Sequence, residues 1–161
     1  MLLTTQAILI LQPTHTPSQK RQGTWAHFCL ILTAILAFIA ALVIIEINKA
    51  SHPETRFTAA HGIMGLITYI LVMLQAAVGV AQYFLPVQIF GSVENGRKVY
   101  RWHRMSGYLL LLLELATIAA STKTYFNKAE LHIPFSAILA GAVLVVAGVG
   151  ARIKKRKLGI V

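Results

Sequence analysis

The chain has 161 residues, of which 57% are hydrophobic and only 12% are charged, and its mean hydropathy is +0.68. These values exclude an ordinary soluble domain. The formal net charge of +10 does not indicate nucleic-acid binding, because the basic residues lie in the connections and tail of a hydrophobic chain. The composition therefore predicts a membrane protein whose surroundings are lipid and which binds no nucleic acid.

The first residues, "MLLTTQAILILQP", contain an apolar run that is too short to span a bilayer and that ends at Pro13. This pattern predicts a short N-terminal apolar half-helix. We expect no signal peptide, because neither a basic start nor a small-residue cleavage site stands out.

Four later stretches are long enough to cross a bilayer core about 30 Å thick, which requires ~20 apolar residues in a helix. No alternating β-barrel pattern competes with helices. The sequence thus predicts an all-α membrane protein, a bundle of four transmembrane helices at about 25–47, 57–84, 102–122 and 133–151. Cys29 lies inside the first span and is expected to be a small packing residue.

The basic residues are divided unequally between the two ends of these spans. If Lys20 and Arg21 face the cytoplasm, eleven of the 15 Lys and Arg residues share that side and four lie opposite. The positive-inside rule then predicts a multi-pass integral membrane protein with a cytoplasmic C-terminus. The basic tail, 152–161, is expected to contact anionic lipid. No feature identifies which membrane holds the chain.

Three of the six histidines lie at the ends of predicted spans. His27 and His103 fall at similar depth near the cytoplasmic side, and His61 lies roughly 25 to 30 Å away towards the other face. One such histidine alone is more often an interfacial residue. Three together favour iron ligation, because ionisable residues in membrane helices are usually functional and two imidazoles from facing helices can hold a haem.

Glycine follows two of these histidines after four residues, in "HGIMG" and "HRMSG". Residues i and i+4 share a helix face, so Gly65 and Gly107 leave room for a flat macrocycle beside His61 and His103. Close helix packing is the alternative role for these glycines, and both interpretations stay open.

Three stretches carry a family resemblance: "WAHFCLILTAILAF", "TAAHGIMGLITYILVMLQAAVGVAQYFLP" and "YRWHRMSGYLLLLLELA". They are similar to the third, fourth and fifth helices of the cytochrome b561 family, six-helix membrane proteins that carry electrons through two b haems. The resemblance covers roughly residues 2–155 and implies one such transmembrane domain over 1–161. It implies that His27 and His103 hold the cytoplasmic-side haem, and that His61 shares the other haem with a histidine on the family's second helix.

The chain departs from the family pattern at its start. The family's first helix has no counterpart, and "MLLTTQAILILQP" resembles only the closing half of the second, without its histidine. We therefore expect an N-terminally incomplete domain with one complete haem b site and a second, incomplete site, as in a truncated product or a genuine short form. His52 and His132 lie on the correct side to replace the missing ligand, but both fall in loops.

Basic residues cluster beside the expected cytoplasmic haem. Charge-assisted hydrogen bonds from such residues would attract haem propionates or an anionic reductant, although topology and lipid contact are the preferred explanation for any one of them. We expect Arg101 and Arg104 to contact a propionate. The cluster comprises Lys20, Arg21, Arg97, Lys98, Arg101 and Arg104.

The resemblance also implies an electron donor and an activity. The donor would be a small anionic reductant such as ascorbate, and the acceptor monodehydroascorbate or ferric iron. The implied activity is that of an oxidoreductase of the ascorbate-dependent transmembrane reductase type. A haem with both axial positions filled suits electron transfer.

Glu114 lies close to mid-membrane, where a charged carboxylate costs about 2.5 to 3.5 kcal/mol. We expect this carboxyl to be protonated or hydrogen-bonded, with Gln75 as its partner. A polar clasp between helices is the preferred role, and a proton relay is the alternative. Met64 and Met105 are expected to pack and not to ligate iron.

Two other functions stay open. The histidines could bind zinc or copper in a non-enzymatic membrane subunit or divalent-metal carrier, which would need carboxylates or thiols that the sequence scarcely offers near them. The chain could also be a truncated remnant that folds but binds nothing productively. Oligomeric state has no sequence signature, and a homodimer is left open.

Overall fold

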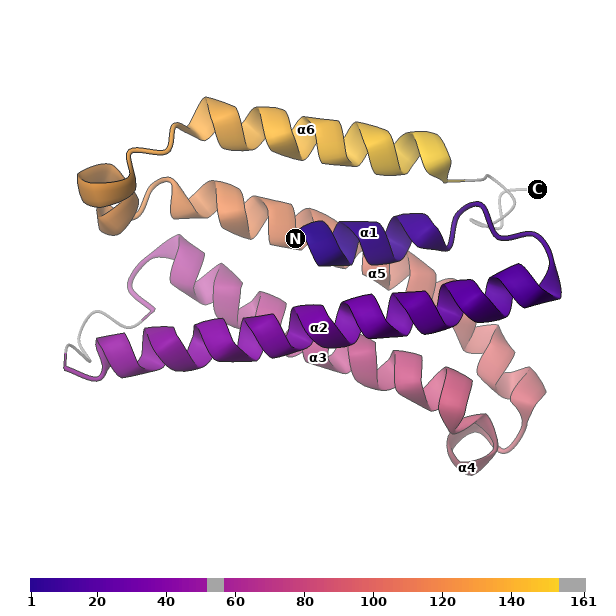
Figure 1. The fold of residues 1–161 in the computed structure, drawn as a ribbon. Helices are drawn as coiled ribbons and strands as arrows, with labels where there is room; N and C mark the ends of the chain where they lie inside the picture. Colours follow the sequence, from indigo (N-terminus) through magenta and orange to yellow (C-terminus); the bar gives the residue numbers. More distant parts are fainter. Residues whose placement is uncertain (52–56, 154–161) are drawn as a thin grey trace.

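The computed structural model describes residues 1–51 and 57–153, and within those ranges every regular element is a helix (Figure 1). Four of the helices are long and apolar enough to cross a membrane, which confirms the predicted all-α bundle. The elements are α1 (Leu2–Ile10), α2 (Pro17–Lys49), α3 (Ala60–Phe84), α4 (Pro86–Phe90), α5 (Val93–Ser121), the π-helical turn η2 (Asn127–Leu131) and α6 (Phe135–Arg152).

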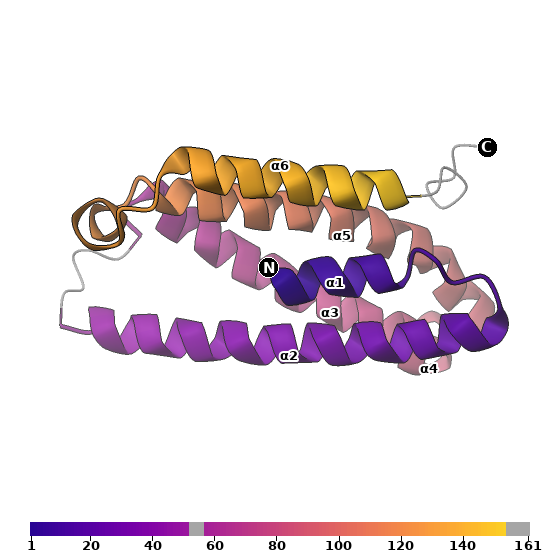
Figure 2. The same cartoon turned by 45° about the horizontal axis from the view of Figure 1, so that its top comes forward.

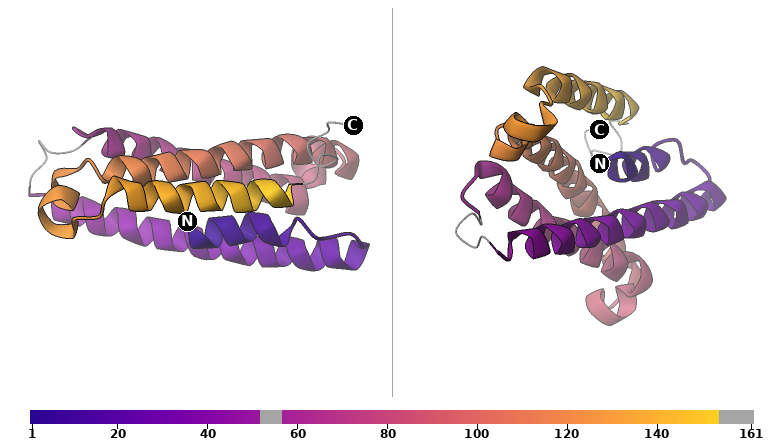
Figure 3. Two further views of the ribbon diagram at one scale, coloured as in Figure 1. Left: turned by 90° about the horizontal axis from the view of Figure 1, so that it is seen from above. Right: turned by 60° about the vertical axis from the view of Figure 1, so that its left-hand side comes forward.

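The long helices run roughly along one axis and alternate in direction (Figures 1 and 3). The start of α2, the end of α3, the start of α5 and the end of α6 lie together with α4 at what we call the α4 end. The opposite, η2 end contains the end of α2, the start of α3 and the start of α6 (Figure 1). The basic residues of α2 and α5 that the sequence grouped therefore share the α4 end.

The predicted N-terminal half-helix is confirmed as α1, which ends before Pro13 and covers only part of the bundle's length (Figure 2). It packs mainly on α2 and also contacts α6. Its apolar side chains Ile8 and Leu9 pack against Leu111, Leu115 and Val149, a small core between α5 and α6. This short helix thus joins the two sides of the bundle.

Helix α2 begins at Pro17 and not near residue 25 as predicted. The cause is a capping box: the Gln19 N–H donates to Thr16 Oγ1 and the Thr16 N–H donates to Gln19 Oε1, both at 3.2 Å. Pro17 occupies the first turn, where its missing N–H has no cost. The apolar run corresponds only to the part of the helix that lipid can cover. A prediction from that run therefore leaves out the polar turns that precede it.

The start of α5 was also predicted too late, at residue 102, because polar residues again precede the apolar run. Gly91 ends α4 with φ 76°, a left-handed conformation that suits glycine. The Ser92 side chain then accepts a hydrogen bond from the Asn95 N–H at 3.1 Å and caps α5. His103 consequently lies well inside its helix and not at the end.

Apolar side chains cover the outside of the bundle and polar ones lie inside it. Among the described residues, six buried residues are apolar and eight are polar or charged, whereas Leu144 of α6 is 73% exposed. This distribution suits a bilayer, which solvates apolar side chains and leaves polar groups to find partners within the protein. Cys29 was expected to be a packing residue but lies on the exposed surface of α2. Helix α2 makes a smaller contact with α3 than α5 makes with α3.

The buried carboxyl of Glu114, 5% exposed, joins α5 to α1. Thr4 Oγ1 donates to Glu114 Oε2 at 2.9 Å, and Gln12 Nε2 donates to Tyr108 Oη at 3.3 Å. The expected bond between Glu114 and Gln75 is wrong, because Gln75 bonds to α5 about three turns nearer the α4 end. The expectation of a polar clasp fits the observed bonds, with α1 as the partner helix.

We expect Thr4→Val to weaken the bundle, because this nearly isosteric change removes the hydroxyl that bonds to Glu114. The free energy of unfolding should fall by about 0.6 kcal/mol, and by no more than ~1.7 kcal/mol. Circular dichroism during SDS titration in mixed micelles measures it. Thr5→Val, in the same turn of α1, is the matched control, and an equal loss in both variants would contradict the clasp.

Candidate functional site

His27 is held on α2 by a backbone group of the half-helix. Its Nδ1 lies 2.8 Å from the carbonyl oxygen of Ala7. A carbonyl only accepts hydrogen bonds, so a neutral ring donates from Nδ1 and keeps the Nε2 lone pair free. Ligating histidines are commonly oriented in this way by a second partner. The half-buried His27 ring is therefore fixed with one nitrogen available.

His61 is held in the same manner at the other end of the bundle. It is the second residue of α3, and its Nδ1 lies 2.9 Å from the carbonyl oxygen of Thr117 on α5. The Thr117 hydroxyl in turn lies 3.0 Å from that of Thr68. Two adjacent polar contacts thus join the start of α3 to the end of α5 and leave Nε2 of His61 free.

His103 differs from the other two because its buried Nδ1 has no hydrogen-bond partner in the described structure. Its ring lies against Gly79 of α3, where an added Cβ would be 3.1 Å from Cε1 and 3.5 Å from Nε2. Its main chain is bonded to the same helix, because Gln75 Nε2 donates to the His103 carbonyl at 2.6 Å. A buried polar atom without a partner is costly and points to a functional requirement.

His27 and His103 occupy equivalent positions in helices that start at the same end. Each follows the first residue of its helix, Pro17 or Val93, by ten positions, or ~15 Å along the axis. The equal count places the two rings at similar depth in the bundle. His61 lies towards the η2 end, apart from this pair.

These histidines suit iron in a macrocycle better than a metal ion held by protein alone. Among the described residues, no three or more His, Cys, Asp and Glu side chains form a group that could hold a metal ion. Protein-bound zinc typically takes three or four such ligands, whereas haem iron needs only two from the protein. Two histidines at similar depth near the α4 end, one with a buried unpartnered nitrogen, agree with that requirement.

The expected propionate contacts lie at the same end. Arg101 is exposed and Arg104 is half-buried on α5, within two residues of His103. Arg21 is exposed on the first turns of α2, where it lines a shallow depression of about 410 Å³ with Pro17, Ser18 and Gln22. The three guanidinium groups therefore lie in the part of the bundle that holds His27 and His103, and their contact with a propionate stays a prediction.

The two proposed substitutes for a second ligand at His61 remain untested. His52 lies outside the described residues. His132 is exposed in the connection from η2 to α6, where its φ of 56° is left-handed. The place of His132 in a loop and its side of the bundle agree with what the sequence predicted. Its pairing with His61 stays a prediction.

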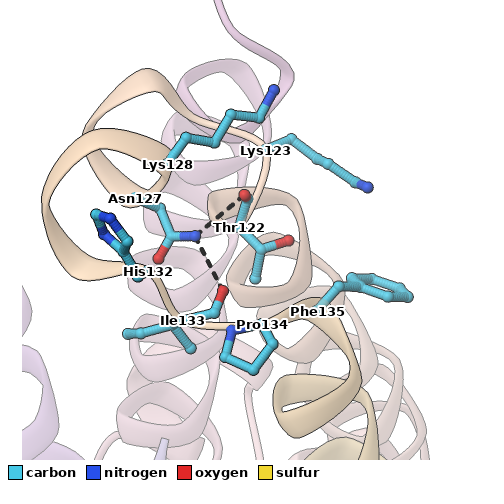
Figure 4. A pocket seen from close by; sticks show the side chains of 8 residues that line it. All are labelled: Thr122, Lys123, Asn127, Lys128, His132, Ile133, Pro134 and Phe135. Carbon is cyan, nitrogen blue, oxygen red and sulfur yellow. Dashed lines mark hydrogen bonds between the residues drawn. The ribbon is translucent and has the colours of Figure 1, made fainter.

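A depression of about 310 Å³ lies beside His132 (Figure 4). Asn127 ties this corner together, because its Nδ2 donates to the carbonyls of Thr122 at 3.1 Å and Ile133 at 3.0 Å. The side chains of Lys123 and Lys128 extend away from His132 and do not converge on one point (Figure 4). The depression is therefore a corner of the fold without a gathered set of charges.

The two glycines of the repeated spacing have different surroundings. A Cβ at Gly65 would meet nothing within 4 Å, so room exists on the face that it shares with His61. A Cβ at Gly107 would lie 3.1 Å from Nε2 of Gln75, so this glycine permits close packing of α5 on α3. Each of the two interpretations holds at one position.

Sequence reasoning missed the face of α3 that contacts α5. Its residues recur at alternating steps of four and three, the spacing typical of two helices packed along a seam. The long apolar run obscured this period, because most positions off the seam are apolar too. The seam residues with a contact to α5 are His61, Thr68, Gln75, Gly79 and Gln82, and Gly65 and Val72 continue the same spacing between them.

Four spanning helices, with His27 and His61 each held by a backbone carbonyl of another helix, define a multi-pass integral membrane protein with oriented histidines in its helix bundle. Residues 1–128 match the family model for eukaryotic cytochrome b561, and the chain belongs to this family. Searches of curated proteins and of solved structures found no match. Family membership implies electron transfer across a membrane that depends on b-type haem. Helix α6 lies beyond the matched residues.

The carbonyl partners of His27 and His61 lead to an expectation about their tautomers. Both neutral rings should carry the proton on Nδ1, because a carbonyl cannot donate. Two-bond ¹⁵N–¹H correlation spectra of histidine-labelled protein without cofactor, in detergent, distinguish the tautomers. Exposed His132, whose side chain makes no hydrogen bond in the described structure, serves as the control and should show no such fixed preference. A dominant Nε2–H form at His27 or His61 would contradict these contacts.

Proposed function

We propose that His27 and His103 are the axial ligands of a b-type haem near the α4 end. The observation that carries the proposal is their equivalent depth, with His27 fixed through Nδ1 and with no partner for the buried Nδ1 of His103. When bound, the haem supplies a one-electron carrier that cycles between ferric and ferrous iron. The protein supplies the orientation of the ligands.

We further propose that the electron donor is a small anion such as ascorbate, which approaches the α4 end. Arg21, Arg101 and Arg104 supply positive charge there. The same end contains no aspartate, and Glu94 is the only one of the described acidic residues that lies at it. Such a field raises the local concentration of an anion and its rate of encounter. The donor loses one electron and the acceptor, monodehydroascorbate or ferric iron, gains one.

The charge distribution supports a cytoplasmic α4 end and a cytoplasmic C-terminus. On this orientation electrons move outward, from the α4 end to the η2 end. His61, held by Thr117, serves a second haem near the η2 end and shares it with a ligand other than His27 or His103. This second cofactor shortens a gap that is otherwise too long for rapid transfer through the bilayer.

The proposal predicts a low-spin b-haem signal in the reduced-minus-oxidised optical spectrum of the purified protein. His27→Ala and His103→Ala should each lose the signal of the α4-end haem, because one axial ligand is removed. His15→Ala, in the exposed connection before α2, is the matched control and should keep the full spectrum. An unchanged haem spectrum in both ligand variants would refute the assignment, and a protein that binds zinc or copper without haem would indicate the metal-carrier alternative.

Recognition of an anionic donor at the α4 end predicts a salt-dependent effect of Arg101→Gln. We expect the KM for ascorbate to rise about 2- to 5-fold at low ionic strength, because one exposed charge is lost, and the difference to shrink as salt is added. Stopped-flow reduction of the haem measures it. Lys128→Gln at the η2 end is the charge-matched control. Equal effects of the two variants would show that net charge, and not the α4 end, determines the KM.

A further inference from the structure

The helices α3 and α5 hold each other's histidines. His61 belongs to α3, but its Nδ1 is bonded to a carbonyl of α5. His103 belongs to α5, but its ring and its main chain both contact α3. These two helices form the most extensive helix–helix contact in the described structure. The pairing therefore fixes two histidines at opposite ends of one seam.

Gln75 contacts α5 beside His103 with both halves of its side-chain amide, one bonded to the main chain and the other to a side chain. Its Nε2 donates to the His103 carbonyl at 2.6 Å, and its Oε1 accepts from Ser106 Oγ at 2.9 Å. A carbonyl has two lone pairs, so this bond adds to the helical one. In a membrane such a bond has no water to replace it. Gln75 thus sets where the α5 backbone lies at the histidine.

Gly79 lies one turn further along the same face of α3 and accommodates the ring itself. A Cβ at this position would approach Cε1 to 3.1 Å, which is tighter than nine in ten contacts of real Cβ atoms. The imidazole would have to move by a few tenths of an ångström. Because Nε2 is 3.5 Å and Nδ1 4.0 Å from the same point, that movement would displace both ring nitrogens, and with them whichever one binds iron.

We propose that Gln75 and Gly79 are positioning residues for His103: the amide sets the backbone and the glycine sets the ring. This inference rests on the proposed function of His103 as an iron ligand. The helix that carries His61 for the η2-end site thereby determines the geometry of the α4-end site. Partners that orient a ligating histidine commonly affect metal binding about 10- to 100-fold, although they touch no metal.

The test compares Gly79→Ala with Gly148→Ala, which adds the same methyl group to α6 at a position with nothing within 4 Å. In protein without haem, the Cε1–H resonance of His103 in histidine-labelled samples should shift in Gly79→Ala and stay in place in Gly148→Ala. In haem-loaded protein, Gly79→Ala should change the low-spin ferric EPR signal and retain the α4-end haem about tenfold less well. The EPR signal depends on how the two imidazole planes are oriented, so a purely structural role would not move it.

Gln75→Met provides a second variant if Gly79→Ala does not assemble, because methionine preserves the length of the side chain and removes both hydrogen bonds. It should shift the same EPR signal and leave the η2-end signal unchanged. If both variants keep a haem signal identical to that of the wild-type protein, this inference is overturned and the proposed function is not. A His103 resonance that is unmoved in Gly79→Ala would also overturn it. Absence of haem from the wild-type protein would overturn the proposed function, and this inference with it.

Discussion

The polar seam between α3 and α5 is the constraint on which the rest of the structure depends. Lipid offers no hydrogen bonds, so polar groups on a spanning helix must be satisfied by a neighbouring helix. His61 finds the Thr117 carbonyl, Thr68 finds the Thr117 hydroxyl, and Gln75 finds the His103 carbonyl. Because these bonds are spread along the seam, neither helix can slide or rotate without breaking several of them.

The half-helix α1 has a comparable role on the other side of the bundle. It bonds to α5 through Thr4 and Glu114, and its Ala7 carbonyl orients His27 on α2. The two histidines of the proposed α4-end site are therefore fixed by different helices, His27 by α1 and His103 by α3. Their mutual geometry depends on how α1, α2, α3 and α5 assemble, which gives the short helix a function beyond filling space.

Several features could be predicted from the sequence because they depend on composition or local spacing. The spans follow from the length of apolar runs, and the similar depth of His27 and His103 follows from counting residues along two helices that start at the same end. The ends of the helices, which depend on local polar residues, were predicted less well. The caps at Thr16 and Ser92 extend α2 and α5 beyond their apolar parts, and an apolar window cannot detect them.

The sequence by itself determined that the chain spans a membrane, which family it resembles and which histidines are candidates for ligands, because these properties depend on residue type and order. Only the tertiary structure decided what each polar side chain bonds to. Glu114 meets Thr4 and not Gln75, and Gly79 meets the His103 ring. The physical reason is rotation: residue spacing places a side chain on a helix face, but helix packing chooses which neighbour that face meets.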